Sequence, residues 1–458
     1  MKWTMFMLDT AECDNTSENV VLCNTLNGAV ITMKRDLYEY SRSLRNAQLQ
    51  EYYQRNNAEN DYTNLCDSDF LIAESKDEKK DFMEMLNTQW TNDERIDIHF
   101  LPTSGCNFKC PYCYQDGIKR NYNMSNADVS IILGKLRHYL DNNKNITQLR
   151  VTLHGGEPTL NWEIVPAFLS GIKEISDERN AELYVTIVTN GYLLDKYKAD
   201  LLSRFHWVRL QVTIDGLKET HNKRRALRNG DPAGSFDTII KNISYVLDND
   251  LIEHVNIRIN YDENNIQEVK ATAKYLSQMF DPGRIMLSFG NISQTVSDTG
   301  AFEYIENNII GQEDFVKSYL EVYEYAFNLG FDLGESFSFS AMCVGKMKHS
   351  FVLSSDGNVY TCLSTVGREE LRSGQWRGDE ELTSRSLMNY SLYDECFKKK
   401  CPLIPLCHCD CRFDALVHEE NINSIWCRKN ILEPLNKSLL TIIYKDYLHN
   451  STSNKSNS

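Results

Sequence analysis

The stretch Cys106-Asn107-Phe108-Lys109-Cys110-Pro111-Tyr112-Cys113 places three thiols in one short loop with the spacing C-x3-C-x2-C. A [4Fe-4S] cluster has four irons, so three cysteine thiolates leave one iron without a protein ligand. That iron can bind and reduce another molecule, which makes the loop a candidate reaction centre. A zinc knuckle and ordinary structural cysteines are the alternatives, and the spacing alone does not exclude them.

The composition restricts the classes of function. The chain has 458 residues, 41% of them hydrophobic, and a formal net charge of -15. This length predicts about two to four domains, and the negative charge argues against binding to nucleic acid. The N-terminus lacks a signal peptide, and no stretch approaches the roughly 18 apolar residues of a membrane span. We therefore expect a globular cytoplasmic protein with no nucleic-acid or membrane partner.

The fourteen cysteines predict metal or cluster ligation. Cytosolic thiols are kept reduced, so a disulfide framework is not expected. Most of the cysteines lie in the opening loop or after residue 342. Cys13, Cys23 and Cys66 are scattered, and we interpret them as ordinary buried thiols.

Residues 1–95 contain a predicted hairpin at Val20–Met33, where two apolar runs flank an Asn-Gly turn. Helix-favouring segments follow at 37–56 and 76–87, with a possible strand at 69–73. This order predicts a small winged-helix module. A simple N-terminal extension of the main domain explains the same pattern.

Residues 96–330 alternate between predicted strands and helices, which indicates an α/β fold with a parallel sheet and right-handed crossovers. One helix begins at Ser125, with Asp128 completing a capping box. Six such units predict a partial or complete barrel that binds ligands at the C-terminal ends of its strands. The expected strands are 96–101, 149–153, 183–188, 208–214, 255–260 and 285–289.

The second strand is followed by Leu153-His154-Gly155-Gly156-Glu157-Pro158. Paired glycines allow close approach of a ligand to the backbone, and a carboxylate such as Glu157 can accept a bond from an ammonium group. A plain strand-to-helix turn is the alternative for such a short motif. Its position one βα unit after the cysteine loop favours a shared binding site.

Together these residues resemble the radical S-adenosylmethionine (SAM) superfamily, over residues 96–330. The resemblance implies a partial (βα)6 barrel in which SAM chelates the open iron and is cleaved to a 5′-deoxyadenosyl radical. The implied cluster ligands are Cys106, Cys110 and Cys113. Tyr112 would pack near adenine, unless it is a core tyrosine. The implied site for the methionine amino group is Gly155, Gly156 and Glu157.

The same resemblance extends to two later segments. Gln211–Gly216 is similar to a family segment in which Thr213 would contact the SAM ribose or carboxylate. Arg225 stands where related enzymes carry an arginine that pairs with the carboxylate, although the neighbouring Arg224 leaves the register open by one residue. Asp215 is a candidate catalytic residue facing the substrate, or a turn-capping aspartate.

Residues 331–435 are rich in cysteine. Cys343, Gly357 and Cys362 flank a predicted hairpin about the Asp356-Gly357 turn, and this arrangement resembles the SPASM domain. The later spacings agree with that domain except between Cys396 and Cys401, where two extra residues are present. We expect the insertion 397–400 to bulge outward. A structural zinc ribbon is the alternative for this region.

The SPASM resemblance implies two auxiliary [4Fe-4S] clusters, three clusters in total. The outer cluster would be held by Cys396, Cys401, Cys407 and Cys427. The inner cluster would be held by Cys343, Cys362 and Cys411. No cysteine occurs in residues 332–342, so the inner cluster would also have an open iron, as in thioether-forming peptide maturases. Cys409 is an additional thiol that leaves the ligand assignment open.

The N-terminal module resembles domains that bind the leaders of ribosomally made precursor peptides. The leading hypothesis is a peptide maturase that forms a cysteine thioether in the barrel, with flavodoxin or ferredoxin as electron donor. Carbon-carbon crosslinking, formylglycine formation and non-catalytic leader binding are the alternatives. Residues 436–458 are expected to form a C-terminal helix and a disordered tail.

Overall fold

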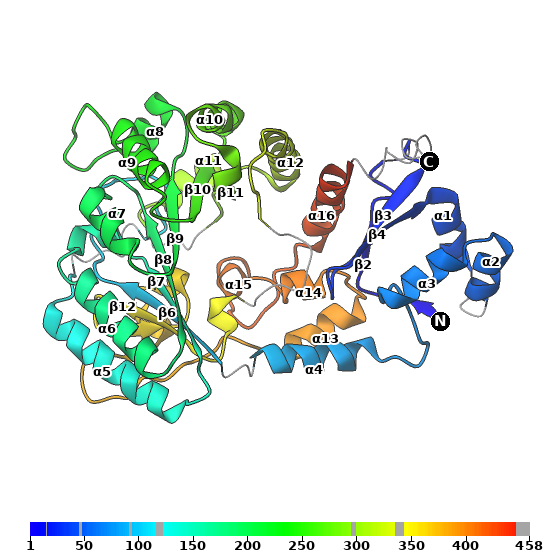
Figure 1. Ribbon diagram of the computed structural model, residues 1–458, viewed down its shortest axis with the longest axis horizontal. Coiled ribbons are helices and arrows are strands. Elements are labelled where there is room, and N and C mark those ends of the chain that lie inside the picture. Colours follow the sequence, from blue (N-terminus) through cyan, green and yellow to red (C-terminus); the bar gives the residue numbers. More distant parts are fainter. Residues whose placement is uncertain are drawn as a thin grey trace. The chain divides into compact units, whose positions relative to one another are not determined.

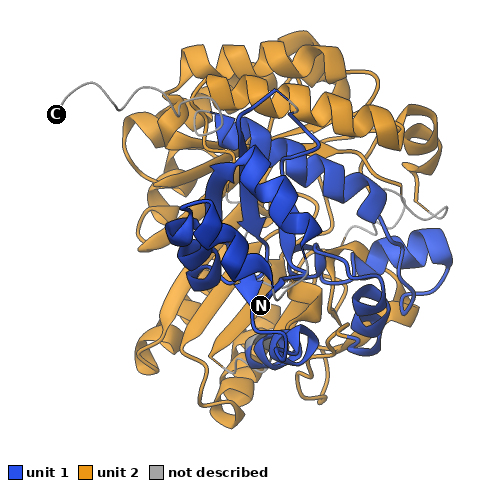
Figure 2. Cartoon of the chain, turned by 90° about the vertical axis from the view of Figure 1, so that its right-hand side faces the viewer, with its two compact units in different colours: residues 1–89, 335–342, 389–458 blue, residues 90–334, 343–388 orange. Residues whose placement is uncertain are grey.

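The computed structural model describes residues 1–14, 16–44, 48–90, 94–115, 122–294, 299–334 and 343–445. These residues form two compact units, which Figure 2 shows in different colours. One unit contains residues 1–89 and 389–445. The other contains residues 90–334 and 343–388. The predicted tail at 446–458 lies outside the described residues.

A nine-stranded sheet, β11-β10-β9-β8-β7-β6-β12-β13-β14, forms the centre of the larger unit (Figure 1). Its first six strands are parallel and are added in sequence order. The α/β class and the parallel sheet predicted from the sequence are therefore confirmed. The six strands are β6 (Arg95–Leu101), β7 (Gln148–Leu153), β8 (Glu182–Thr189), β9 (Trp207–Thr213), β10 (His254–Tyr261) and β11 (Ile285–Asn291).

Helices connect these strands, and the predicted capping box at Ser125 is present. The Ser125 hydroxyl accepts a hydrogen bond from the Asp128 amide at 3.3 Å, and the Asp128 carboxylate accepts one from the Ser125 amide at 2.8 Å. The α-helices are α5 (Asn126–Asn142), α6 (Val165–Glu178), α7 (Lys196–Leu202), α8 (Lys218–Arg224), α9 (Phe236–Asp248), α10 (Ile266–Met279), α11 (Phe302–Asn308) and α12 (Gln312–Asn328). The 3-10 turns are η2 (Pro158–Asn161) and η3 (Pro282–Arg284).

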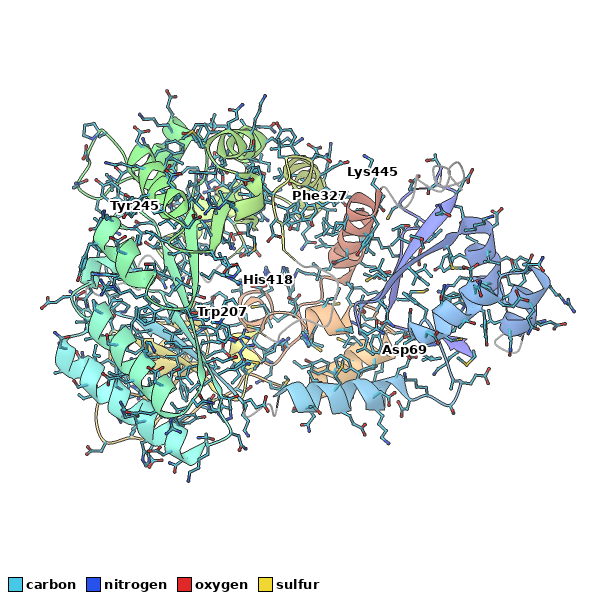
Figure 3. All side chains as sticks on the ribbon, in the orientation of Figure 1. Asp69, Trp207, Tyr245, Phe327, His418 and Lys445 are labelled. Atoms are coloured by element: carbon cyan, nitrogen blue, oxygen red, sulfur yellow. The ribbon has the colours of Figure 1, made fainter. Side chains whose placement is uncertain are left out.

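The two faces of the parallel sheet differ in chemistry. Alternate residues such as Leu149, Val151 and Leu153 are buried in the apolar core that the strands share with helices. The intervening residues point to the opposite face, which is polar and includes Arg150 and Thr152. Trp207, at the start of β9 on this face (Figure 3), remains 40% exposed. The strands therefore enclose a polar interior instead of the packed core of a closed barrel.

The predicted hairpin after residue 350 is confirmed, with β12 (Ser350–Ser354) antiparallel to β13 (Asn358–Tyr360). Gly357 has a φ of 94° in the turn, a conformation that favours glycine. The sequence did not indicate that β12 would pair in parallel with β6 and extend the barrel sheet. A further strand, β14 (Arg372–Gln375), pairs with β13. Short turns η4 (Val344–Lys346), η5 (Leu363–Thr365) and η6 (Glu369–Leu371) flank these strands.

The smaller unit begins with a three-stranded antiparallel sheet in the order β2-β3-β4. The hairpin predicted about Asn27-Gly28 is β3 (Asn19–Asn24) paired with β4 (Val30–Lys34). The remaining elements are β1 (Lys2–Trp3), β2 (Met7–Asp9), α1 (Arg35–Ser43), α2 (Leu49–Arg55), α3 (Glu59–Asp67), β5 (Leu71–Ile72) and α4 (Glu78–Trp90). Its identity as a winged helix stays a prediction.

The last part of the chain folds against this N-terminal sheet. The 397–400 insertion exposes Lys398, Lys399 and Lys400, as expected. Phe397 differs from the expectation, because its ring packs inward, 5.6 Å from that of Phe82 and 6.3 Å from that of Phe6. The Thr25 hydroxyl also donates to the Pro402 carbonyl at 2.6 Å. The helices of this part are α13 (Ser391–Lys398), α14 (Ile404–Cys407), α15 (Arg412–Glu419) and α16 (Lys429–Ile443).

The boundary between the two compact units falls inside one of the four domains expected from the sequence. The cysteine-rich region was expected as one domain at 331–435, yet residues 343–388 belong to one unit and residues from 389 onward to the other. The division into functional domains therefore stays a prediction. No helix in the described ranges is long and apolar enough to cross a membrane.

We predict that Ser125→Ala destabilises the larger unit by about 1 kcal/mol, because an alanine at the N-cap leaves the first helical amides without their acceptor. Thermal and urea denaturation followed by circular dichroism would measure the change. Ser130→Ala in the same exposed helix is the control, since its hydroxyl only bonds the carbonyl four residues earlier. Equal stability of the two variants would contradict the role of the cap.

Candidate active site

The cysteine loop leaves the C-terminal end of β6, where the sequence predicted it. Cys106, Cys110 and Cys113 are all half-buried thiols in this loop. The segment after α8 fixes the loop, since the Lys109 amide donates to the Ala226 carbonyl at 2.9 Å and the Arg228 amide to the Asn107 carbonyl at 2.8 Å. The structure therefore brings the three predicted cluster ligands together in a loop with a defined backbone.

The glycine loop after β7 packs backbone to backbone against the cysteine loop. The Gly156 amide donates to the Thr103 carbonyl at 3.1 Å, and the Glu157 amide donates to the Gly105 carbonyl at 2.8 Å. Gly155 has a φ of 129°, and a Cβ on Gly156 would lie 1.9 Å from the Gly105 oxygen. Both glycines are required by this contact.

The Glu157 carboxylate is buried and accepts several hydrogen bonds within the protein. Its Oε1 accepts from the Thr159 amide at 3.0 Å and from the Thr189 hydroxyl at 2.7 Å. Its Oε2 accepts from the Asn190 amide at 2.7 Å. Glu157 thus joins the ends of β7 and β8, and its predicted contact with an ammonium group stays a prediction.

Tyr112, Asp215 and Arg225 meet beside the cysteine loop. The Tyr112 hydroxyl donates to Oδ2 of Asp215 and accepts from Nη1 of Arg225 at 2.8 Å. Asp215 is fully buried, and its Oδ1 accepts from the Asn260 amide at 2.9 Å. The three residues, predicted from separate segments, therefore form one hydrogen-bonded group. The catalytic role of Asp215 stays a prediction.

The electrostatics of this group favour a charged guanidinium. Burial alone would lower the pKa of Arg225, but the adjacent Tyr112, Cys110 and Asp215 raise it well above its usual value. Burial raises the pKa of Tyr112, which remains a neutral donor. Burial also raises the pKa of the Cys110 thiol to about 11, against the opposing effect of Arg225.

Arg224 and Arg225 are distinguished by their partners. Nη1 of Arg224 donates to Asp262 at 2.8 Å and to the Tyr304 hydroxyl at 3.0 Å, whereas Arg225 reaches the Tyr112 hydroxyl. Sequence reasoning missed Asp262 and Tyr304. The position of Asp262 one residue after β10, at the ligand-binding end of a parallel sheet, is the signal that could have identified it.

Several buried N–H groups of the two arginines have no hydrogen-bond partner among the described residues: Nε and Nη2 of Arg224 and Nε of Arg225. Unpaired buried donors are costly, and a planar carboxylate matches a guanidinium well. The group already contains two guanidiniums and two carboxylates, so a zwitterionic amino-acid group would add no net charge. These residues fit the methionine end of SAM.

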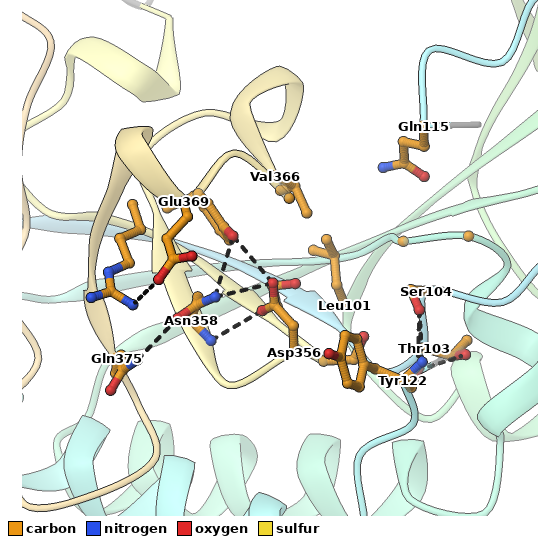
Figure 4. A pocket seen from close by; sticks show the side chains of 17 residues that line it. Leu101, Thr103, Ser104, Gln115, Tyr122, Asp356, Asn358, Val366, Glu369 and Gln375 are labelled. Atoms are coloured by element: carbon orange, nitrogen blue, oxygen red, sulfur yellow. Dashed lines mark hydrogen bonds and ion pairs between the residues drawn. The ribbon is translucent and has the colours of Figure 1, made fainter. Parts of the chain in front are cut away.

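Thr213 is buried at the end of β9, next to Arg258 in the register of the neighbouring strand. A cavity of about 440 Å³ lies beside the glycine loop, lined on one side by Ser104 and Gly155 and on the other by the β12–β13 hairpin (Figure 4). Asp356 and Asn358 from this hairpin bond each other in the cavity wall, as Figure 4 shows. The cavity has the size of a small-ligand site.

Residues 100–276 match the model of the radical SAM superfamily. This stretch is a radical SAM domain. The cysteine loop, the glycine loop and Arg225 all lie within it. The family uses a [4Fe-4S] cluster and SAM, and the loop with three cysteines supplies the soft thiolate donors that such a cluster needs.

Individual proteins are similar to this chain over a longer stretch than the radical SAM domain alone. A cysteine-type anaerobic sulfatase-maturating enzyme of Clostridium perfringens is 24% identical over 342 residues, spanning 68% of this chain and 86% of that protein. Native anSMEcpe with bound AdoMet and Kp18Cys peptide has a TM-score of 0.60 at 21% identity, covering 77% of this chain and 99% of its own. SuiB of Streptococcus suis bound to the precursor peptide SuiA has a TM-score of 0.51 at 15% identity, covering 93% and 99%. Both structures share the fold of this chain.

The cysteines after the radical SAM domain divide between the two units. Cys343 and Cys362 belong to the unit that contains the barrel sheet, and the later cysteines belong to the other. The predicted inner set of Cys343, Cys362 and Cys411 draws on both units and stays a prediction. In the described part of the chain, no three Cys, His, Asp or Glu side chains converge as ligands of a single ion. A [4Fe-4S] cluster differs from a single-ion site, because each cysteine thiolate binds a different iron of the cluster.

The predicted outer set, Cys396, Cys401, Cys407 and Cys427, lies within one unit. The extra thiol Cys409 is buried, and its sulfur lies 3.6 Å from that of Cys396. This contact lowers the pKa of Cys396. The turn at His408, Cys409 and Asp410 has three consecutive positive φ angles, an unusual conformation that concentrates at functional sites. The outer ligand set stays a prediction, with Cys409 as a further candidate ligand.

We predict that Gly156→Ala abolishes SAM binding, because the added Cβ would displace the cysteine loop at Gly105. Equilibrium dialysis with labelled SAM and the iron content after reconstitution would measure the loss. Gly134→Ala is the matched control, since a Cβ there meets no atom within 4 Å and the position is helical. Retention of full SAM affinity by Gly156→Ala would contradict the close packing of the loops.

We also predict that Arg225→Gln weakens SAM binding at least about tenfold, because it removes a buried cation and leaves Asp215 without its charge partner. Lys223→Gln, which removes one exposed charge from the same helix, is the matched control. Circular dichroism would check that both variants fold. If the two variants had equal dissociation constants for SAM, Arg225 would have only a structural role.

Proposed function

We propose that this chain is a radical SAM enzyme that modifies a ribosomally made precursor peptide by forming a cysteine thioether. The observation that supports SAM chemistry most directly is the group of buried, unpaired N–H donors on Arg224 and Arg225 beside the cysteine loop. A protein that only bound a leader peptide would have no use for them. They also argue against a simple iron-sulfur electron carrier.

When bound, the [4Fe-4S] cluster and SAM supply a 5′-deoxyadenosyl radical that removes a hydrogen atom from the substrate. The chain's own residues would hold the components in place. Cys106, Cys110 and Cys113 would ligate three irons, the glycine loop would contact the amino-acid end of SAM, and Arg225 would pair with its carboxylate. Tyr112 and Asp215 would fix the orientation of Arg225.

The polar inner face of the sheet supports a peptide substrate, because an extended peptide needs hydrogen-bonding partners. The relatives named above support the same substrate class, since one structure contains the Kp18Cys peptide and another the precursor peptide SuiA. In the smaller unit, β4 is an edge strand of the three-stranded sheet, and an added leader strand could pair along its outer edge. The proposed partner is therefore a precursor peptide with a leader segment.

Thioether formation joins a peptide sulfur to a peptide carbon and removes one hydrogen from each. One hydrogen atom would go to the deoxyadenosyl radical, one proton to solvent, and one electron to the predicted inner cluster. The sequence supports this choice, because Cys343 and Cys362 have no further cysteine in residues 332–342. An inner cluster with an open iron could hold the substrate thiolate.

Formylglycine formation is the second candidate, and the sulfatase-maturating relative favours it. Such an enzyme would oxidise a cysteine or serine of its substrate without forming a crosslink. Carbon-carbon crosslinking is a third possibility that leaves the peptide thiols unchanged. The fate of the substrate sulfur distinguishes the three reactions.

The test is anaerobic incubation of the reconstituted protein with SAM, dithionite and a cysteine-bearing precursor peptide. We expect deoxyadenosine and a peptide that has lost two hydrogen atoms, kept its sulfur and become resistant to thiol alkylation. An aldehyde that reacts with a hydrazide would favour formylglycine, and an alkylatable crosslinked peptide would favour a carbon-carbon bond.

Cys110→Ala should abolish deoxyadenosine formation, because it removes a predicted cluster ligand. Cys13→Ala is the matched control, since this thiol belongs to none of the three predicted clusters and is exposed, contrary to the burial expected from the sequence. If the unaltered protein formed no deoxyadenosine, the proposal would be wrong.

A further inference from the structure

The 397–400 insertion creates a basic surface that the proposed chemistry does not yet use. Phe397 is held by Phe6 and Phe82, so the chain turns at this point and leaves Lys398, Lys399 and Lys400 exposed. Lys400 has a φ of 45°, a strained conformation for a residue with a side chain. The insertion is therefore anchored at one end and presents its lysines to solvent.

Lys399, Lys400, Lys429 and Lys437, which we call the lysine surface, line two grooves in the same unit. The smaller groove, of about 610 Å³, contains Lys399, Lys429 and Lys437 together with the exposed Cys427. The larger groove, of about 1050 Å³, contains Lys400 and shares Lys429 and Lys437 with the smaller one. A predicted cluster ligand therefore lies among these lysines.

The charge of this surface is opposite to that of the chain. Eight basic and five acidic side chains line the two grooves, whereas acidic residues outnumber basic ones by 64 to 49 in the sequence. Lys398 pairs with Glu395 at 2.7 Å. Lys429 pairs with Glu433 at 3.5 Å, and Lys437 pairs with Glu12 and with Glu433, each at 3.3 Å. Lys399 and Lys400 form no ion pair with any residue that the structure describes. Their charges are available to a partner.

We propose that the lysine surface is the docking site of the acidic electron-carrier protein that drives SAM cleavage. This inference rests on the proposed function, in which one electron must reach the cluster of the cysteine loop before SAM can be cleaved. The carrier is oxidised by one electron, and SAM is reductively cleaved to methionine and the deoxyadenosyl group. An electron passes between proteins only over a short distance, so the carrier must dock beside an exposed redox group. The predicted outer cluster, with the exposed Cys427 as one ligand, would be such a group, and the charge of the surface around Cys427 complements an acidic protein.

An acidic segment of the precursor peptide is the competing occupant, because the larger groove also contains Trp3 and Met5. The exposed cysteine in the smaller groove favours the carrier. Complexes of electron carriers are small and depend on charge steering, which suits a few exposed lysines.

The test compares Lys399→Glu/Lys400→Glu with Lys144→Glu/Lys274→Glu, a control with the same change in net charge at exposed lysines of the other unit. Calorimetry would measure binding of an acidic flavodoxin to the reconstituted protein. We expect the first variant to bind at least about tenfold more weakly than the control. The affinity of the unaltered protein should fall steeply between about 0.01 M and about 1 M salt, as the Debye length falls from about 30 Å to about 3 Å.

Deoxyadenosine formation provides the second readout. With NADPH, flavodoxin reductase and flavodoxin, the Lys399→Glu/Lys400→Glu protein should need about tenfold more flavodoxin for half-maximal rate, whereas its rate with dithionite should match that of the control. Equal flavodoxin binding by both variants, or no binding by the unaltered protein, would overturn the proposal. Loss of binding to a precursor peptide with unchanged flavodoxin binding would assign the surface to the leader. Failure of dithionite to support any cleavage would instead contradict the proposed function.

Discussion

The close approach of two backbone loops is the constraint on which the candidate site depends. Gly156 lies so near the Gly105 carbonyl that no side chain fits between them. The amides of Gly156 and Glu157 then bond the first turn of the cysteine loop. This contact fixes the position of the thiols relative to the end of β7. The glycines therefore position the cysteine loop as well as offering backbone groups to a ligand.

The second constraint is the charge balance beside the loops. Arg224 and Arg225 are buried side by side, which is tolerable only because Asp262 and Asp215 are buried with them. The Tyr112 hydroxyl links Arg225 to Asp215 and joins the cysteine loop to this group. The unpaired N–H donors that remain have a cost in the free protein, and a bound carboxylate would offset it. These donors are what supports the proposed binding of the SAM carboxylate at this site.

Local patterns in the sequence predicted most of the regular structure. Each strand of the parallel sheet was expected within one or two residues at either end, because alternation and flanking turns are properties of a short segment. The Ser125 capping box and both hairpins were predicted for the same reason. The pairing of β12 with β6 was not, since it depends on which edge of the sheet is free. Burial of Phe397 against Phe6 depends on a contact between residues far apart in the chain.

In the candidate site, too, local motifs were predictable from the sequence and contacts between distant residues were not. Cys106, Gly156 and Arg225 belong to short motifs and could be found from spacing, whereas Asp262 and Tyr304 act through distant neighbours and carry no motif. Arg224 and Arg225 show the limit of motif-based prediction. The sequence did not decide which of them matches the family's arginine, and they differ only in their hydrogen-bond partners in the structure. Arg224 has a carboxylate of its own, so its charge is already compensated within the protein. Arg225 shares its carboxylate with Tyr112, and its pairing with the SAM carboxylate stays a prediction.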